Sequence, residues 1–61
     1  MLKLKGKRVE KGLTQEKIAK LLNMEKSAYA RKENEVVQFR LDEVKRILEI
    51  LDCSFDDIFL D

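Results

Sequence analysis

The feature that most limits the possible folds is the interruption at Asn23-Met24, which separates two stretches of helical character. Residues 15–22 carry apolar side chains at helical spacing, and residues 25–34 (EKSAYARKEN) contain no proline or glycine. Asn23 can adopt the left-handed conformation that ends a helix. Because only two or three residues then connect the helices, the chain must turn sharply, which is the geometry of a helix-turn-helix.

Three more helices are expected around this pair, so the predicted fold is all-α. Thr14 is a candidate N-cap for the second helix, and Ser54 with Asp57 approximates a capping box for the last. The predicted helices span residues 2–11, 15–22, 25–34, 41–51 and 55–59, and residues 35–40 form a loop. Inward-facing residues are expected to include Ile18, Leu21, Leu22, Leu41, Val44, Ile47, Leu48 and Leu51, with Val37, Phe39 and Cys53 packed beside them.

The composition suits one domain over residues 1–61. At 61 residues, with 44% apolar side chains, a chain buries only about 60% of the surface of its unfolded form. One cysteine and no histidine leave neither an internal disulfide nor a zinc site. No segment approaches the roughly 20 apolar residues of a membrane span. We expect a soluble, cytoplasmic protein that uses no cofactor, metal or small-molecule ligand and, without the usual catalytic constellations, is not an enzyme.

The net charge of +1 conceals two halves of opposite sign. Residues 1–32 carry ten lysines and arginines against three acidic residues, whereas residues 33–61 carry three against nine. A basic face on an otherwise neutral protein is typical of docking onto a polyanion. Chance clustering of charges on solvated helix faces is the alternative.

One stripe of the helix predicted over residues 25–34 contains Lys26, Ser27, Ala30 and Arg31. In the DNA major groove, lysine and arginine donate to guanine, serine contacts several base edges, and a small alanine permits close approach. The alternative is that Lys26 and Arg31 only solubilise a surface helix. The position of this helix, after a tight turn and in the basic half, favours DNA recognition.

Four stretches carry a family resemblance: KGLTQEKIA at residues 11–19, LNM at 22–24, YARKEN at 29–34 and SFDDIF at 54–59. In this order and spacing, from about Leu4 to Phe59, the chain resembles the DNA-binding domains of the Cro/C1-type (XRE) helix-turn-helix family, which includes phage repressors. The resemblance implies a compact five-helix bundle that is lambda-repressor-like, with the second and third helices as the DNA-reading pair.

The resemblance also implies roles for individual residues. Gln15 would contact a backbone phosphate, and Arg8 would form a partly buried ion pair with Glu33 at the end of the DNA-reading helix. Base edges or nearby phosphates would face Lys26, Ser27 and Arg31. The expected DNA-binding residues are Gln15, Lys26, Ser27, Ala30, Arg31, Asn34 and Arg40.

Several positions depart from the family pattern. Glu25 replaces the usual serine or threonine N-cap, and its charge would oppose nearby phosphates. Lys32 stands where an apolar residue is usual, so we expect its stem beside Tyr29 and its ammonium group directed outward. Glu35 replaces a common glycine, which leaves Asn34 as the expected left-handed residue. In the loop, Arg40 is the only cation, and each lost phosphate contact lowers the salt slope of DNA binding by about 0.9.

Two functions stay open. The first is a sequence-specific regulator of transcription, bacterial or phage-borne, that binds double-stranded DNA as a repressor and as a homodimer, with Leu60 beside Ile58-Phe59 as a candidate dimer contact. The second is a protein-interaction module, antitoxin-like or accessory, that keeps the fold but binds DNA weakly. Glu25 and the cation-poor loop favour the second function.

Overall fold

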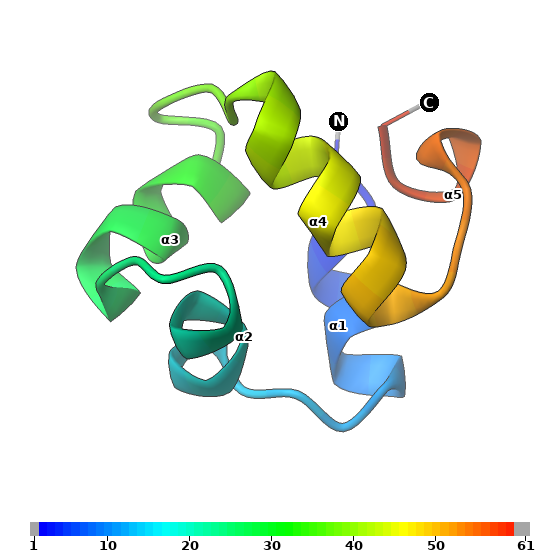
Figure 1. Ribbon diagram of the computed structural model, residues 1–61, viewed down its shortest axis with the longest axis horizontal. Helices are drawn as coiled ribbons and strands as arrows, with labels where there is room; N and C mark the ends of the chain where they lie inside the picture. Colours follow the sequence, from blue (N-terminus) through cyan, green and yellow to red (C-terminus); the bar gives the residue numbers. More distant parts are fainter. Residues whose placement is uncertain (1, 60–61) are drawn as a thin grey trace.

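The computed structural model describes residues 2–59 of the chain. Its helices are α1 (Leu4–Glu10), α2 (Gln15–Leu21), α3 (Lys26–Glu33), α4 (Leu41–Leu51) and α5 (Phe55–Phe59), as Figure 1 shows. No strand occurs within this part of the chain, and residues 34–40 form the loop between α3 and α4. The all-α prediction is confirmed, and each helix lies within a few residues of its expected bounds.

The helices are arranged as two pairs with α4 between them. α2 packs against α3 on one side, and α1 packs against α5 on the other (Figure 1). The N–H of Lys3 donates to the carbonyl of Ile58 at 2.9 Å, which joins the start of α1 to α5. The outer faces of α2 and α3 therefore lie on the side of the molecule away from α5.

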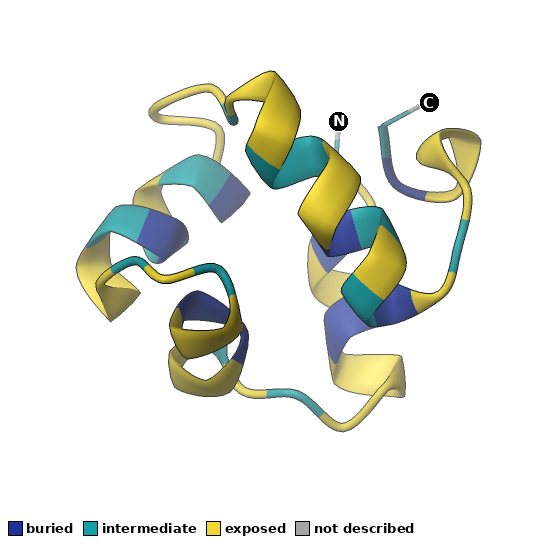
Figure 2. Ribbon diagram, viewed as in Figure 1, coloured by how far each residue is buried: buried dark blue, intermediate teal, exposed yellow. Residues whose placement is uncertain are grey.

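Every helix contributes at least one fully buried side chain to the core. Leu4, Ile18, Tyr29, Ile47, Leu51 and Ile58 are completely buried, and Ala19 nearly so. In Figure 2 these buried segments are turned toward the centre of the molecule. The chain has neither a disulfide nor a histidine-based metal site, so the burial of each of these side chains contributes a large share of the free energy of unfolding.

The loop between α3 and α4 is attached to the core through Phe39. Its ring lies 6.0 Å from that of Tyr29 and 6.2 Å from that of Phe59, measured between centroids. Pairs of this kind contribute about 0.5–1.5 kcal/mol beyond area burial. The prediction for Phe39 is confirmed, but that for Val37 is wrong: Val37 is 46% exposed, because the aromatic ring fills the space beneath the loop. Cys53 is half-buried against the core.

Two leucines expected to face inward are also exposed, Leu21 by 47% and Leu41 by 71%. On α2 the buried face is centred on Ile18, Ala19 and Leu22. With 3.6 residues per turn, Leu21 lies about 60° from Ile18 on the side away from Leu22 and so falls at the edge of that face. Leu41 is the first residue of α4, at the end of the helix that extends past the core (Figure 2).

The first four helices end in one shared motif. A single residue after each helix has a positive φ: Gly12, Asn23, Glu35 and Asp52, at 75°, 58°, 64° and 51°. After α2, the N–H of Asn23 donates to Lys20 and that of Met24 donates to Ala19, which is the Schellman pattern. The prediction that Asn23 is left-handed is confirmed.

At the end of α3 the same motif corrects a prediction. Asn34 was expected to be the left-handed residue, but its φ is −86° and the left-handed residue is Glu35. The N–H of Val36 donates to Arg31 at 2.8 Å, and that of Glu35 donates to Lys32 at 3.1 Å. These two bonds require the positive φ one residue beyond Asn34, so Glu35 adopts it despite its side chain.

The helix starts follow the expected caps in part. The Thr14 hydroxyl accepts from the N–H of Lys17 at 3.1 Å, which confirms that N-cap. Before α5, the Asp57 carboxylate accepts from the N–H of Ser54 at 3.0 Å, as a capping box requires. The Ser54 hydroxyl, however, donates to the same carboxylate, and the N–H of Asp57 bonds to the Ser54 carbonyl. Only half of that capping box is therefore present.

Candidate nucleic-acid interface

α2 and α3 form the helix-turn-helix, and α3 begins directly after Glu25. Glu25 occupies the N-cap position with an extended backbone, but its side chain accepts no hydrogen bond from the helix. Its carboxylate is exposed instead. A negative charge therefore stands at the start of α3, where it would repel an approaching phosphate.

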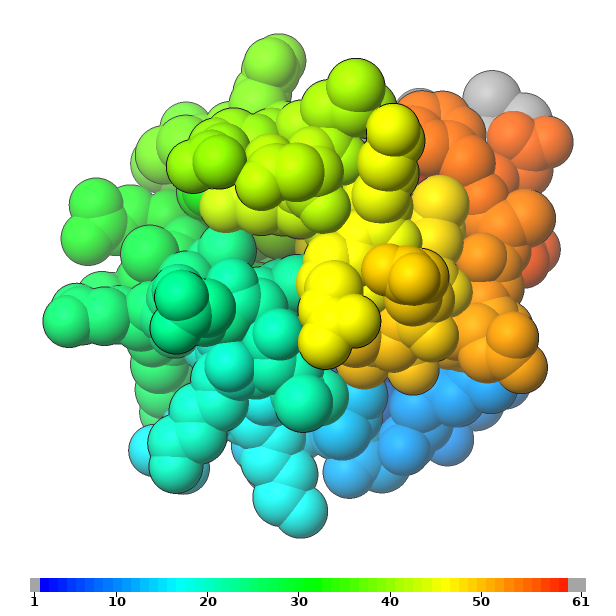
Figure 3. All heavy atoms as spheres, in the orientation of Figure 1, coloured from blue at the N-terminus to red at the C-terminus, as the bar shows by residue number. Residues whose placement is uncertain are grey.

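The outer face of α3 is polar and cationic. Lys26, Ser27 and Arg31 are exposed, with the half-buried Ala30 between them. Within residues 2–59, neither Lys26 nor Arg31 takes part in an ion pair. Side chains of the α3 region protrude from the left edge of the space-filling view in Figure 3. Of the other expected DNA-binding residues, Gln15 is half-buried, and Asn34 and Arg40 are exposed.

The inner face of α3 has only two buried residues, Tyr29 and Glu33. One of them is charged, so apolar packing alone cannot hold this helix. Arg8 on α1 supplies the opposite charge: its Nε donates to Glu33 Oε1 at 2.8 Å, and its Nη2 approaches Oε2 at 3.3 Å. The structure thus contains the buried ion pair that the family resemblance implies.

Three further hydrogen bonds complete this network. The Tyr29 hydroxyl donates to Glu33 Oε1 at 2.8 Å, Gln15 Nε2 donates to Oε2 at 2.9 Å, and Arg8 Nη1 donates to the Leu13 carbonyl at 2.7 Å. Among the described residues, no buried side-chain nitrogen or oxygen lacks a partner. The Glu33 carboxylate therefore joins α1, α2 and α3 at one point, and removing it would leave Arg8 as a buried charge without its partner.

The ionisation of this network is fixed by its geometry. Burial raises the pKa of Glu33, but hydrogen bonds from Arg8, Gln15 and Tyr29 together bring it below its ordinary value. The hydrogen bond to Glu33 raises the pKa of Arg8, and burial followed by the bond to Glu33 raises that of Tyr29. At neutral pH the pair is thus charged and Tyr29 keeps its proton.

Lys32 corrects a second prediction about α3. Its ammonium group was expected to point into solvent, but Nζ lies 2.7 and 2.8 Å from the two carboxylate oxygens of Glu43 on α4. Both side chains are mostly buried, with 14% and 12% exposure. Glu43 also accepts from the N–H of Arg40 at 2.8 Å. The carboxylate at the start of α4 offers the ammonium group a partner inside the fold, so the lysine stem leads inward.

The pKa of Glu43, like that of Glu33, is lowered in the folded protein. Burial raises the pKa of its carboxyl group, whereas the hydrogen bonds from the Lys32 side chain and the Arg40 backbone bring it below its ordinary value. α3 is therefore held to the rest of the molecule by two ion pairs, one to α1 and one to α4.

Sequence reasoning did not identify several of these partners. Tyr29 and Glu33 lie four residues apart on one helix face, a spacing that could have indicated their contact. Glu43 lies three residues after Arg40, the spacing of a capping box. No local pattern indicates that Gln15 reaches Glu33 or that Lys32 reaches Glu43, because these contacts depend on how separate helices pack.

A helix-turn-helix family model matches residues 4–58 of the 61-residue chain, which covers α1 to α4 and most of α5. The chain belongs to the Cro/C1-type helix-turn-helix family. This is a family of DNA-binding regulators and not of enzymes, and membership supports double-stranded DNA as a partner. Comparisons with curated proteins and with solved structures found no match.

None of the helices within residues 2–59 has the length and apolarity needed to cross a membrane.

In this Cro/C1-type domain, the loop before α4 contains one arginine, Arg40, and two exposed valines. The Arg40 guanidinium is paired with its neighbour Asp42, at 3.2 Å from Nε to Oδ1 and 3.0 Å from Nη2 to Oδ2. Val36 and Val37 are exposed beside it. Because Asp42 lies beside it, a phosphate that approaches the one cation of the loop also meets a negative charge.

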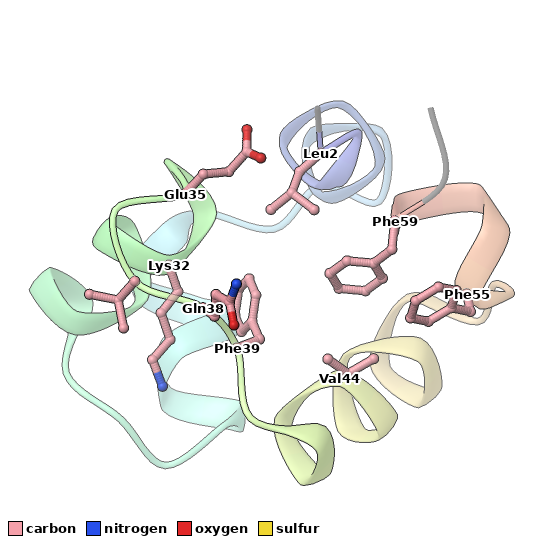
Figure 4. A pocket seen from close by; sticks show the side chains of 9 residues that line it. Leu2, Lys32, Glu35, Gln38, Phe39, Val44, Phe55 and Phe59 are labelled. Carbon is pink, nitrogen blue, oxygen red and sulfur yellow. The ribbon is translucent and has the colours of Figure 1, made fainter.

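A mainly apolar hollow of about 380 Å³ is lined in part by residues of the same loop. Figure 4 shows Phe39, Val44, Phe55 and Phe59 around it, with Lys32 and Glu35 at its edge. The rings of Phe55 and Phe59 are stacked at 4.9 Å, yet Phe55 is still 51% exposed. This family member therefore presents an aromatic surface that is separate from the cationic face of α3.

Proposed function

We propose that this Cro/C1-type domain, over residues 1–61, reads the sequence of double-stranded DNA with α3 in the major groove and so regulates transcription. The observation that carries the proposal is the pair of exposed cations, Lys26 and Arg31, on a helix that buried ion pairs hold to the rest of the fold. By occupying an operator, a bacterial or phage regulator of this kind acts as a repressor.

Each side chain of that face has a distinct role in the proposal. Lys26 and Arg31 donate to the N7 and O6 of guanine, and a well-formed bidentate contact of this kind discriminates by about 1–3 kcal/mol. Ser27 contacts base edges, and Ala30 allows close approach. Gln15, Asn34 and Arg40 contact the phosphate backbone, which positions the helix without reading sequence.

Salt-dependent duplex binding tests this proposal. We expect fluorescence anisotropy to show binding that weakens steeply with salt, and we expect the double variant Lys26→Ala with Arg31→Ala to lose most of it. Lys45→Ala is the matched control, because Lys45 is an exposed cation on α4. Circular dichroism establishes that all variants are folded. Equal binding by the double variant and the control would contradict the proposal.

The proposal includes a homodimer, because one α3 helix reads only a few base pairs. Specificity then requires two half-sites about 34 Å apart on a two-fold axis. Ile58 is fully buried and cannot contact a second copy, whereas Phe55 on the same helix is 51% exposed, so Phe55 is the proposed dimer contact. Leu60, the earlier candidate, lies outside the described residues. Sedimentation with and without duplex, for the wild type and Phe55→Ser, tests this dimer.

A protein-interaction module is the second candidate. Three features favour it. The Glu25 side chain at the start of α3 is negatively charged and does not cap the helix, Arg40 is paired with Asp42, and Val36 and Val37 are exposed. Weak duplex binding that is unaffected by loss of Lys26 and Arg31 would support this function over the first.

A further inference from the structure

Glu25 places a carboxylate at the start of α3, directly before Lys26 and Ser27. Its backbone is fixed there, because the N–H of Tyr29 donates to the Glu25 carbonyl at 3.0 Å. Its side chain is exposed, accepts no hydrogen bond from the helix and forms no ion pair with any residue from 2 to 59. The carboxylate is therefore not used to hold α3 and is available to a ligand.

Two other carboxylates near α3 have structural partners. Glu33 is paired with Arg8, and Glu43 is paired with Lys32, and all four side chains are mostly buried. Glu25 differs from them because it lies at the N-terminal end of α3, in solvent. In a helix-turn-helix complex the N-terminal residues of the recognition helix lie nearest the base edges. The Glu25 carboxylate would thus be close to bases as well as to phosphates.

The chemistry of the major groove decides what a carboxylate can contact there. A carboxylate only accepts hydrogen bonds. Guanine N7 and O6 and thymine O4 are also acceptors and repel it, whereas cytosine and adenine present amino groups that donate. Adenine has its N7 acceptor next to the amino group, but cytosine presents no acceptor in this groove. Cytosine is therefore the base whose edge fits Glu25 best.

We propose that Glu25 reads a cytosine in the major groove by accepting a hydrogen bond from its N4 amino group. The inference rests on the proposed function and adds to it an acceptor beside the donors Lys26 and Arg31. Repulsion by the phosphates lowers the affinity of Glu25 for every sequence. The same charge rejects guanine and thymine at one position, so the residue that weakens binding also makes it more specific.

Selection from random duplexes with the wild type, Glu25→Gln and Glu25→Ser tests this contact. A wrong base at a contacted position costs about 5- to 150-fold in affinity. The wild type should prefer cytosine over guanine and thymine by a factor in this range at one position of each half-site. Both variants should lose this preference and bind random-sequence duplex more tightly, because a repulsive charge is gone. Serine is a strong N-cap residue, so Glu25→Ser should fold at least as stably as the wild type.

A duplex with N4-methylcytosine at the selected position tests the amino group itself. In the paired base, the methyl group replaces the amino hydrogen that faces the major groove. The wild type should bind this duplex at least about fivefold more weakly than the unmodified one, and Glu25→Ser should bind both equally. Glu16→Gln is the matched control, because Glu16 is an exposed carboxylate at the start of α2. It should keep the cytosine preference and the sensitivity to the methyl group.

The outcomes separate this inference from the proposed function. If Glu25→Gln selects the same motif as the wild type and only binds it more tightly, Glu25 merely repels DNA, and the inference is wrong while the proposed function stands. A preference for another base that depends on Glu25 would also overturn the inference alone. If the folded wild type enriches no motif, sequence reading by α3 and the role of Glu25 are both overturned.

Discussion

Gln15 on α2 donates a hydrogen bond of 2.9 Å from Nε2 to Oε2 of Glu33 on α3. The same carboxylate accepts from Arg8 on α1 and from the Tyr29 hydroxyl. A residue proposed to contact the DNA backbone is thus part of the network that holds the DNA-reading helix in place. Stability and recognition therefore share a carboxylate, and experiments must separate the two effects.

Arg8→Ala should strongly destabilise the fold. It leaves Glu33 buried without its charged partner, a change that costs about 3–5 kcal/mol. For a domain of this size each kcal/mol corresponds to about 4–8 °C in Tm, so the variant should melt far below the wild type or be unfolded at 25 °C. Lys7→Ala is the control: its contact with Glu10 is 3.7 Å long and joins a partly exposed lysine to an exposed glutamate, and its loss should cost at most about 1 kcal/mol. Small, equal shifts in calorimetry would show that the Arg8–Glu33 pair does not hold α3.

Stability should be flat near neutral pH and fall in acid. With no histidine in the chain, no side chain is expected to titrate between about pH 6 and 8 at its ordinary pKa. The pKa values of Glu33 and Glu43 are lower in the folded state than the ordinary value of a glutamate, so the unfolded chain binds protons more readily. Their contribution is complete above that value and is lost as the pH falls through the folded pKa.

Glu43→Gln offers a direct check of this acid dependence. The variant should be less stable than the wild type at pH 7, but the gap should narrow as the pH falls from about 5 to 3, because the wild-type carboxylate then becomes neutral as well. Thermal melts across this range measure the gap. A constant difference between the two proteins at every pH would exclude a charged Glu43 as the stabilising species.

The Lys32–Glu43 contact should show energetic coupling in a double-mutant cycle. Lys32→Met keeps the apolar stem and Glu43→Gln keeps the shape, so the cycle isolates the charge interaction. We expect a coupling of about 0.5–3 kcal/mol, since both side chains are mostly buried. The exposed pair Arg46–Glu49, at 3.9 Å, is the control and should give about 1 kcal/mol or less. Denaturant unfolding measures both cycles, and similar coupling in the two pairs would contradict the buried contact.

Glu35→Gly should stabilise the protein, although glycine usually destabilises. A left-handed non-glycine residue costs about 1–2 kcal/mol, and the extra entropy that glycine loses on folding costs about 0.5–1 kcal/mol, so the net gain is at most about 1.5 kcal/mol. Asn34→Gly is the control, because Asn34 has a φ of −86° and glycine there brings only the entropic loss. The denaturant midpoint should rise for the first variant and fall for the second. The reverse order would place the left-handed residue at 34.

Much of this fold could be predicted from local signals in the sequence. The Thr14 cap, the left-handed Asn23 and the apolar stripe of α4 each act within a few residues, and the helix bounds followed from them. Where the predictions failed, the answer depended on distant parts of the chain. Leu41 has the right spacing but begins α4 beyond the end of the core, and a helical pattern alone does not reveal where the core ends.

Only part of the candidate site could be predicted from the sequence. The exposed face of α3 followed from helix periodicity, and the Arg8–Glu33 pair followed from the family resemblance. The partner of Lys32 did not follow from either, because Glu43 reaches it only after the loop folds back across α3. The Arg40–Asp42 pair is local, but residues two apart on a helix do not face each other, so its spacing gave no indication of the contact.

Selection from random duplexes at two salt concentrations tests the central claim that α3 reads DNA sequence. The account predicts enrichment of a two-fold symmetric motif with half-sites about one helical turn apart. It also predicts that the same selection with Arg31→Ala loses the preference at one position of each half-site while overall binding weakens only in part. No enrichment by the wild type at either salt concentration, from protein shown to be folded, would contradict the claim.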